Sequence, residues 1–379
     1  MEWKEVRLGD ILNFRRGHDL PHSAMKPGNI PVAGSNGVIG YHDTATPIKP
    51  ILTIGRSGNV GKPYFYEEAW AHNTTLYVDD FKGNDPKFLY YLCQTMPFAN
   101  FGGGSAVPTL NRNHIHPLET KIPVKVEDQC RIASILSSLD RKIELNNKIN
   151  ADLEEMAQAI FKNWFVDFEP FKDGKFVDSE LGMIPEGWKV GTLGDFCKCL
   201  LGGTPSRSKE EYWNGDVNWI NSGEINKFRI LEASEKITEL GLSKSATKLL
   251  PKKTTVLAIT GATLGQVSLL EIDTCANQSV IGVLENTEIP YEYIYPFIKD
   301  RIEMLIQHQT GGAQQHINKD NVESLIFLLP AKNVLEGYIS LVRPMYKRIE
   351  SQCFENLYLS LLRDTLLPRL MSGEIEVPE

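Results

Sequence analysis

The sequence predicts a mixed α/β (α+β) fold with two tandem globular domains, separated by a long antiparallel two-helix coiled coil in a pseudo-twofold internal repeat. Three observations predict this architecture: one segment recurs later in the chain, apolar residues keep a heptad spacing over more than four heptads, and short β-rich runs broken by turn residues precede each helical segment. A chain of 379 residues has room for about two to three domains.

The internal repeat is the strongest of these signals. The opening WKEVRLGD, residues 3–10, recurs as WKVGTLGD, residues 188–195. Further on, GSAVPTLN at 104–111 aligns without gaps on GGAQQHIN at 311–318. The other matching pairs are Gly17 and Gly202, Pro123 and Pro330, and Ile132 and Ile339. The offset grows from 185 to 207, which predicts an insertion near the start of the second copy.

Each copy contains β-rich runs followed by a helical pattern, so each is expected to form a small mixed α/β domain. In the first copy the expected strands are 30–33, 51–54 and 75–78, and the expected helix is 86–94. In the second copy the expected strands are 218–220, 255–259 and 279–283, and the helix is near 294–307.

A heptad seam follows the first copy from Ile132 to Trp164, with no Gly or Pro inside it. A helix of this length, about 50 Å at 1.5 Å per residue, is too long to bury its apolar stripe against one small domain and needs a helical partner. The segment 335–367 repeats the pattern and is expected to pack antiparallel, as a pseudo-twofold axis favours. Asn146, Asn150 and Asn356 fall at seam positions, where they either fix the register or face water if the helices diverge.

These signals divide the chain into five parts. The expected parts are globular domain 1 at 1–123, a central helical spacer at 124–170, a linker at 171–187, globular domain 2 at 188–330, and a C-terminal helical spacer at 331–379.

The composition is that of an ordinary soluble protein. The chain has no long apolar run for a membrane span, and its first residues lack the features of a signal peptide, so we expect a cytoplasmic protein with its six scattered cysteines reduced. The net charge of −8 disfavours a polyanionic partner at long range. Residues 1–123 carry 12 Lys and Arg against 11 Asp and Glu, residues 188–330 carry 14 against 17, and the remaining −6 lies in the helical and linking parts.

Several catalytic signatures are absent or incomplete. The run from Arg56 to Lys62 resembles a phosphate loop but has Arg in place of the first Gly and Pro63 in place of the hydroxyl residue. The chain contains neither a G-x-G-x-x-G after a strand nor the Asn-Pro-Pro-aromatic signature of adenine methyltransferases. His114 and His116 have no third ligand nearby in sequence and are interpreted as turn residues, so we expect no catalytic residue and no metal.

The loops of both copies instead carry side chains suited to reading a polymer. Arg can pair with guanine edges, Asn and Gln with adenine edges, and Lys, Ser and Thr with phosphates. Alternatively, each of these residues caps a turn. The candidate DNA-binding residues are Arg15, Arg16, Asn36, Arg56, Ser57, Asn59, Lys62, Asn73, Thr74, Ser105, Thr109, Arg112, Thr204, Ser206, Arg207, Ser222, Thr263, Asn277, Gln278, Gln314, Gln315 and Lys319.

The whole chain resembles the DNA-specificity subunits of type I restriction-modification systems. The resemblance rests on ELGMIPEGWK at 180–189 with LGD at 193–195, GGTPS at 202–206, IFKNWFVDF at 160–168, and the ending LRDTLLPRLMSG at 362–373. It implies a non-catalytic reader of a bipartite DNA site, in which each globular domain is a target-recognition domain and the helices set the unread gap between the half-sites.

The resemblance also implies partners. Two methylation subunits, which methylate adenine N6, dock on the helices, and restriction and motor subunits join for cleavage. S-adenosylmethionine and ATP are expected on these partners, with no cofactor on this chain. The helical surfaces expected to bind partners lie around Ile132, Leu139, Ile143, Leu153, Ile339 and Ile349.

Two other functions stay open from the residues alone. One is a self-sufficient DNA methyltransferase or nuclease, against which the missing motifs argue. The other is a coiled-coil scaffold that binds only protein. Incubating the chain alone with S-adenosylmethionine and DNA tests the first, and selection from random DNA pools tests the second.

Overall fold

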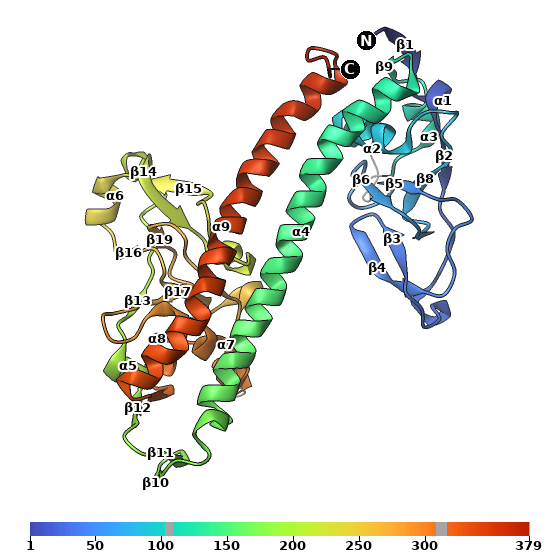
Figure 1. Ribbon diagram of the computed structural model, residues 1–379. Coiled ribbons are helices and arrows are strands. Elements are labelled where there is room, and N and C mark those ends of the chain that lie inside the picture. Colours follow the sequence, from blue (N-terminus) through green and yellow to red (C-terminus); the bar gives the residue numbers. More distant parts are fainter. Residues whose placement is uncertain (103–108, 308–316, 379) are drawn as a thin grey trace. The chain divides into compact units, whose positions relative to one another are not determined.

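The computed structural model describes residues 1–102, 109–307 and 317–378. The chain divides into two compact units (Figure 1): unit 1 comprises Met1–Glu144 and Leu357–Glu379, and unit 2 comprises Leu145–Asn356. Two helices of 40 residues each, α4 (Val126–Phe165) and α9 (Lys332–Met371), contribute one part to each unit. Each unit therefore joins a globular portion to one segment of both helices.

In the residues that the structure describes, the globular portion of unit 1 contains three sheets. A β1–β9 pair precedes the helix α4, a four-stranded sheet has the order β2-β8-β5-β6, and a three-stranded sheet has the order β4-β3-β7. The strands are β1 (Trp3–Arg7), β2 (Asn13–Arg16), β3 (Ile30–Gly34), β4 (Gly37–His42), β5 (Ile51–Gly55), β6 (Pro63–Tyr66), β7 (Trp70–Ala71), β8 (Thr75–Asp80) and β9 (Glu119–Pro123). The helices are α1 (Leu8–Ile11), α2 (Pro86–Thr95) and α3 (Arg112–Ile115), with 3-10 turns at His22–Ala24 and Phe98–Phe101.

Unit 2 repeats this topology. A β12–β21 pair precedes α9, one four-stranded sheet has the order β13-β20-β17-β18, and another has the order β15-β14-β19-β16. The strands are β10 (Phe176–Ser179), β11 (Gly182–Pro185), β12 (Lys189–Thr192), β13 (Cys199–Leu201), β14 (Trp213–Ile220), β15 (Glu235–Ile237), β16 (Leu249–Leu250), β17 (Thr255–Ala258), β18 (Val267–Leu269), β19 (Thr274–Ala276), β20 (Val280–Val283) and β21 (Ile326–Leu329). The helices are α5 (Leu193–Phe196), α6 (Glu239–Ser243), α7 (Tyr291–Gln307) and α8 (Lys319–Glu323), with 3-10 turns at Glu169–Phe171, Glu210–Tyr212, Ser222–Asn226 and Gly261–Thr263.

The extra length of the second copy is located between two equivalent strands. In unit 1 the chain passes from β3 to β5 through residues 35–50, which include β4. In unit 2 it passes from β14 to β17 through residues 221–254, which include β15, α6 and β16. The insertion therefore lies between β14 and β17, in the first half of the second copy.

The two long helices pack antiparallel in each unit. In unit 2, Asn146 and Asn150 of α4 contact Asn356 and Cys353 of α9, so residue numbers fall along one helix as they rise along the other. In unit 1, Ile132 at the start of α4 shares an apolar cluster with Leu370 near the end of α9. The helix α9 thus supplies the helical partner that the heptad seam requires.

The amides at the seam lie between the helices. Asn146 has no exposed surface and Asn150 is 2% exposed, which rules out for these two residues the alternative that they face water. Asn146 Nδ2 donates to Asn356 Oδ1 at 2.8 Å, and Gln352 Nε2 donates to Asn146 Oδ1 at 3.0 Å. These hydrogen bonds offset the free-energy cost of burying the amides. They also make the register of α4 against α9 specific, because a shifted register would leave the amides unpaired.

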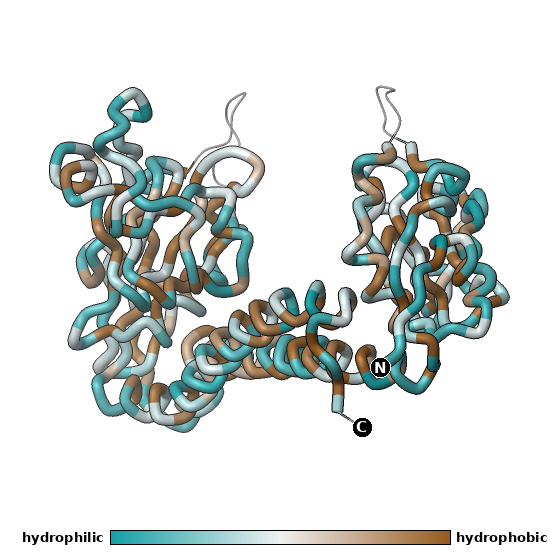
Figure 2. Tube along the Cα trace, turned by 90° about the horizontal axis from the view of Figure 1, so that it is seen from above, coloured by the Kyte–Doolittle hydropathy of each residue, from teal (hydrophilic) through white to brown (hydrophobic). Residues whose placement is uncertain are grey.

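Apolar side chains form a separate core in each unit. Figure 2 shows apolar stretches inside both globular portions and alternating apolar and polar residues along α4 and α9. The unit 1 core includes Phe14, Leu52 and Tyr91, and the unit 2 core includes Tyr293 and Phe327. All six cysteines are free thiols. Among the described residues, no helix is both long and apolar enough to cross a bilayer.

Candidate nucleic-acid interface

In unit 1, the candidate loops meet at one end of the β2-β8-β5-β6 sheet. The backbone leaves β2 through Gly17, where a Cβ atom would lie 2.1 Å from the carbonyl oxygen of His72, so the close approach requires glycine. Arg56, directly after β5, donates its N–H to Thr74 O at 2.8 Å, and Leu110 N donates to Arg56 O at 2.7 Å. These backbone bonds bring four chain segments, distant in sequence, to one edge.

The side chains at this edge form a connected polar group. Arg56 Nη1 donates to Asn73 O at 3.4 Å, and the Asn73 side-chain amide donates to the Asp19 carboxylate. Arg16 forms an ion pair with the same carboxylate at 3.2 Å. Ser57, Thr74 and Thr109 belong to this edge through a β-bridge between Ser57 and Thr109 and the bond from Ser57 N to Thr74 O.

Asn36, Asn59 and Lys62 lie on loops beside this group. Asn36 is exposed in the turn between β3 and β4, and Asn59 is exposed in the connection from β5 to β6. The Lys62 ammonium lies 5.4 Å from the centre of the Tyr64 ring, a cation–π contact at the surface. The two amide groups and the ammonium group therefore face solvent, where a bound polymer can reach them.

The second repeat builds the same edge with different side chains. Gly202, equivalent to Gly17, would place a Cβ atom 2.2 Å from Asn277 O, so the same close approach recurs. Thr204 Oγ1 donates to Gln278 Oε1 at 2.6 Å, which joins the loop after β13 to the loop before β20. Asn277 N donates to Ile220 O at 3.1 Å, so the end of β14 belongs to this edge as well.

Two tryptophan indoles hold the loop 202–207. Trp219 Nε1 donates to Gly203 O at 3.1 Å, and Trp213 Nε1 donates to Ser206 O at 3.2 Å. The Arg207 guanidinium stacks 3.6 Å from the centre of the Trp213 ring and forms a bidentate ion pair with Glu235 of β15. The hydrogen bond with Glu235 raises the pKa of Arg207, and the same bond lowers the pKa of Glu235.

Ser222 and Thr263 lie in the two 3-10 turns that follow β14 and β17. Asn221 caps the first of these turns by accepting a hydrogen bond from Gly223 N at 2.8 Å. Both Ser222 and Thr263 are partly exposed. They carry hydroxyl groups in the turns after these strands.

Three candidates stand apart from these edges. Arg15 pairs with Asp79 at 3.3 Å, and Arg112 donates to Phe14 O at 3.2 Å, near the middle of β2. Lys319, the repeat equivalent of Arg112, pairs with Glu323 at 2.9 Å. The structure therefore does not bring Arg15, Arg112 and Lys319 together with the other candidates. Ser105, Gln314 and Gln315 lie outside the described residues.

The helical residues chosen as centres of partner binding contact the chain itself. Ile132 and Ile349 have no exposed surface, and Ile339 is 8% exposed. Leu139, Ile143 and Leu153 are partly buried. A partner on these helices therefore cannot contact the buried side chains of Ile132, Ile339 and Ile349 to any extent, whereas Leu139, Ile143 and Leu153 keep some exposed surface.

Carboxylates beside the cations are the main feature that the sequence analysis missed. Asp19, Asp79 and Glu235 each neutralise one candidate arginine. Asp19 lies three residues from Arg16 and could have been found by its spacing, whereas Asp79 and Glu235 come from other strands. The arginine of each pair is more than half exposed, whereas the Asp79 and Glu235 side chains are 15% and 35% exposed. Solvent screening at the arginines keeps the contribution of each pair to stability small, and a phosphate is an alternative partner for each guanidinium.

The described residues offer no cluster of three or more His, Cys, Asp or Glu side chains that could hold a metal ion. His116 accepts a hydrogen bond from Phe14 N through Nε2 at 3.0 Å and stacks on the Phe14 ring, which gives it a packing role. Burial raises the pKa of the Cys197 and Cys199 thiols to about 12, the latter aided by nearby Glu323, so neither thiol is an activated nucleophile.

Comparisons with known proteins identify relatives of the whole chain. The family model of the type I restriction modification DNA specificity domain matches residues 1–155 and 185–334. The type I restriction enzyme MjaIX specificity subunit of Methanocaldococcus jannaschii is 30% identical over 77% of this chain and 70% of its own length. The HindI specificity subunit of Haemophilus influenzae is 27% identical over 98% of this chain and 94% of its own length.

A solved structure shares the fold. The crystal structure of a type I restriction-modification S subunit from M. genitalium has a TM-score of 0.65 and 15% sequence identity, covering 98% of this chain and 96% of that one. The two family matches fall on the two repeats described above. The chain therefore belongs to the family of the type I restriction modification DNA specificity domain.

Proposed function

We propose that this chain is the DNA-specificity subunit of a type I restriction-modification complex and that each repeat reads one half of a bipartite site. The observation that carries the proposal is the pair of equivalent loop edges. Both repeats use the same strand ends and the same close-approach glycine, Gly17 or Gly202, yet present different side chains. A shared scaffold with variable reading groups is what two different half-sites require.

The domain division supports this assignment. We infer that residues 1–123 and 188–330 are the two target-recognition domains and that 124–170 and 331–379 are helical spacers. The linker 171–187 joins the central spacer to the second domain, and the C-terminal spacer follows that domain directly. The seam amides and the antiparallel packing in each unit support a coiled-coil spacer. Lengthening both helices by one heptad between Leu139 and Leu153, and at the matching place in α9, should widen the unread gap without changing either half-site.

The proposed partners carry the chemistry. We infer that two methylation subunits supply S-adenosylmethionine-dependent adenine methylation and that motor and nuclease subunits use ATP. The role of this chain is then to recognise the DNA sequence at which those subunits act. Purified chain incubated alone with S-adenosylmethionine and DNA should transfer no methyl groups, and turnover by the chain alone would refute this division of labour.

The decisive experiment maps which sequence is methylated by the assembled complex. Arg56→Ala, at the unit 1 edge, should weaken methylation at sites that depend on one half-site. Gln278→Ala, at the unit 2 edge, should affect the other half-site only. Selection from a random DNA pool, followed by sequencing, measures both. If neither change altered either half-site, these loop edges would not be the readers.

A further inference from the structure

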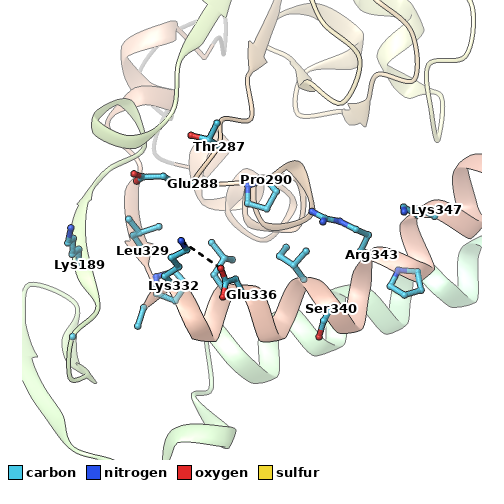
Figure 3. A pocket seen from close by; sticks show the side chains of 16 residues that line it. Lys189, Thr287, Glu288, Pro290, Leu329, Lys332, Glu336, Ser340, Arg343 and Lys347 are labelled. Atoms are coloured by element: carbon cyan, nitrogen blue, oxygen red, sulfur yellow. Dashed lines mark ion pairs between the residues drawn. The ribbon is translucent and has the colours of Figure 1, made fainter.

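A groove of about 940 Å³ lies within unit 2, away from the residues assigned to DNA reading. It runs between the first turns of α9, the paired strands β12 and β21, and the loop that precedes α7. Figure 3 shows the α9 side chains along one side and Thr287, Glu288 and Pro290 on the other. All of its lining residues belong to unit 2.

The lining has an apolar floor and a basic rim. Leu329, Leu335 and Ile339 contribute apolar groups, while four cations face two carboxylates around the edge. These charged residues are Lys189, Lys332, Arg343, Lys347, Glu288 and Glu336.

The cations differ in how far they are already neutralised. Arg343 Nε is held by Glu292 at 2.6 Å, and Lys332 lies 3.9 Å from Glu336. Lys189 and Lys347 form no ion pair with any described residue, and Figure 3 shows them at opposite ends of the groove. The groove therefore offers free positive charge at both ends and apolar surface between them.

The equivalent place in the first repeat is filled. Gln129, the counterpart of Glu336, is 1% exposed and accepts a hydrogen bond from Asp85 N at 3.0 Å. Its amide donates to Asn84 Oδ1 at 3.0 Å and to Pro123 O at 3.1 Å, which ties the loop before α2 to the start of α4. Gln129 thereby locks the two elements together.

The second repeat cannot form this lock. Pro290 stands directly before α7, as Asp85 stands directly before α2, and proline has no N–H to donate. Glu336 instead turns outward, where it is 67% exposed. The two copies therefore differ at this place, because Gln129 is buried against the loop before α2, whereas Glu336 is exposed and lines the groove.

The dimensions of the groove suit a polypeptide. Its α9 lining extends from Lys332 to Lys347, about 22 Å at 1.5 Å per residue. An apolar floor flanked by free cations at both ends matches a segment with apolar anchors and carboxylates on either side.

We propose that this groove docks an acidic segment with apolar anchors from a protein subunit of the restriction-modification complex. The proposal rests on the proposed function, because it assumes that the chain works within such a complex. A segment bound in the groove contacts α9 and also β12, β21 and the loop before α7. The partner would therefore contact the second repeat and not the first.

The first test identifies what occupies the groove. A photo-crosslinking amino acid is placed at Ser340, an exposed lining residue, and at Ser351, an exposed residue of α9 outside the groove. The complex is then assembled from the full chain and its catalytic subunits and irradiated. We expect position 340 to capture one acidic segment of a partner subunit. Capture of DNA, of a basic segment, or of nothing at position 340 would overturn the proposal.

The second test measures the contribution of charge. Reversing both free cations, Lys189→Glu with Lys347→Glu, should weaken assembly by about tenfold at low salt and reduce its salt dependence. The control Lys198→Glu changes an exposed lysine outside the groove and should leave assembly unchanged. Equal effects of the reversal and the control would contradict a role for the groove.

The two proposals fail in different ways. If the groove proposal alone is wrong, the groove variants assemble normally and the wild-type complex still methylates a bipartite sequence. If the proposed function is wrong, selection from random DNA enriches no bipartite sequence, whatever the crosslinks show.

Discussion

The guanidinium of Arg229 lies 2.6 Å from the carboxylate of Glu154, and the Arg229 side chain is 1% exposed. The same carboxylate accepts a hydrogen bond from the Tyr295 hydroxyl at 2.6 Å and pairs with Lys299 at 2.9 Å. Glu154 of α4 thus joins the insertion of the second repeat, through Arg229, to the helix α7. This buried group fixes the globular portion of unit 2 to its segment of α4.

Glu154→Ala should lower the stability of unit 2 by about 3–5 kcal/mol, because it leaves the buried Arg229 charge without its partner. Thermal and urea unfolding of the full chain measure the loss. Glu155→Ala, at the next and exposed position of the same helix, is the matched control and should change stability by less than about 0.5 kcal/mol. Similar unfolding of both variants would show that the Arg229 contact contributes nothing.

The ionisation of Glu154 predicts that the stability of unit 2 depends on pH. Burial alone would raise the pKa of Glu154, but attraction to Arg229 and Lys299 and the Tyr295 hydrogen bond outweigh it and lower the pKa below its usual 4.5. Because the pKa of Glu154 is lower in the folded chain than in the unfolded chain, ionised Glu154 stabilises the fold fully above about pH 4.5. This stabilisation is lost as the pH falls toward the pKa of Glu154 in the folded chain. The difference in melting temperature between wild type and Glu154→Gln should therefore shrink with acidification below about pH 4.5. A difference that grew in acid would reverse the assigned sign.

Asn146→Leu tests the amides between the helices. The change removes the partner of Gln352 Nε2 and Asn356 Oδ1, and we expect a loss of about 1–3 kcal/mol. Chemical denaturation measures the loss, with the exposed neighbour changed in Lys148→Ala as the control. A stabilised Asn146→Leu chain would mean that the amides serve register alone, at the expense of stability.

Substitution of glycine by alanine should lower the stability at two positions, Gly17 and Gly202, and raise it at a third, Gly337. Gly17→Ala and Gly202→Ala would each drive a methyl group into a backbone carbonyl and should destabilise their repeats by about 1–3 kcal/mol or more. Gly337→Ala, within α9, meets only the Trp164 ring at 3.7 Å and should stabilise the chain by up to about 1 kcal/mol through helix propensity. Melting temperatures of the three variants provide the comparison. Destabilisation by Gly337→Ala would show that its site is tighter than the distance indicates.

Glu235→Gln tests whether a carboxylate restrains a DNA-binding cation. Freeing Arg207 should tighten non-specific DNA binding and steepen its salt dependence by about one charge. Binding titrations at several salt concentrations measure both, and Glu232→Gln, which changes a nearby exposed carboxylate, controls for the general change in charge. Equal salt slopes for the two variants would mean that Arg207 does not contact phosphate.

The sequence could predict the parts of the fold that rest on local pattern. The helix Pro86–Thr95 matches the expected helix 86–94 closely, and the repeat predicts equivalent sheets because matching residues occupy matching strands. The long helices begin at Val126 and Lys332, close to the expected starts of the helical spacers at 124 and 331. The apolar seams begin later, at 132 and 335, and the first turn of α4 carries polar groups such as Gln129 that no apolar pattern reveals.

The candidate site was predictable in its loops but not in its charge balance. The repeat predicted polar loops at equivalent places of the two copies, and in the first copy the structure brings Arg56 and Asn73 together. Glu235 lies 28 residues from Arg207 on another strand, and Glu154 lies 75 residues from Arg229, so neither pairing leaves a local trace. Such contacts depend on tertiary packing, which leaves no short pattern in the sequence.

Both long helices are divided between the two units, and this division affects the order in which the units can fold during synthesis on the ribosome. Unit 2 is one continuous stretch, Leu145–Asn356, and its core needs no residue from outside that stretch. Unit 1 needs Leu367, Leu370 and Met371 for its core, and the Met1 amino group pairs with Glu376 at 3.5 Å. The core of unit 1 can therefore close only after Leu367, Leu370 and Met371 have been made, and until then the part of its apolar surface that they cover stays exposed.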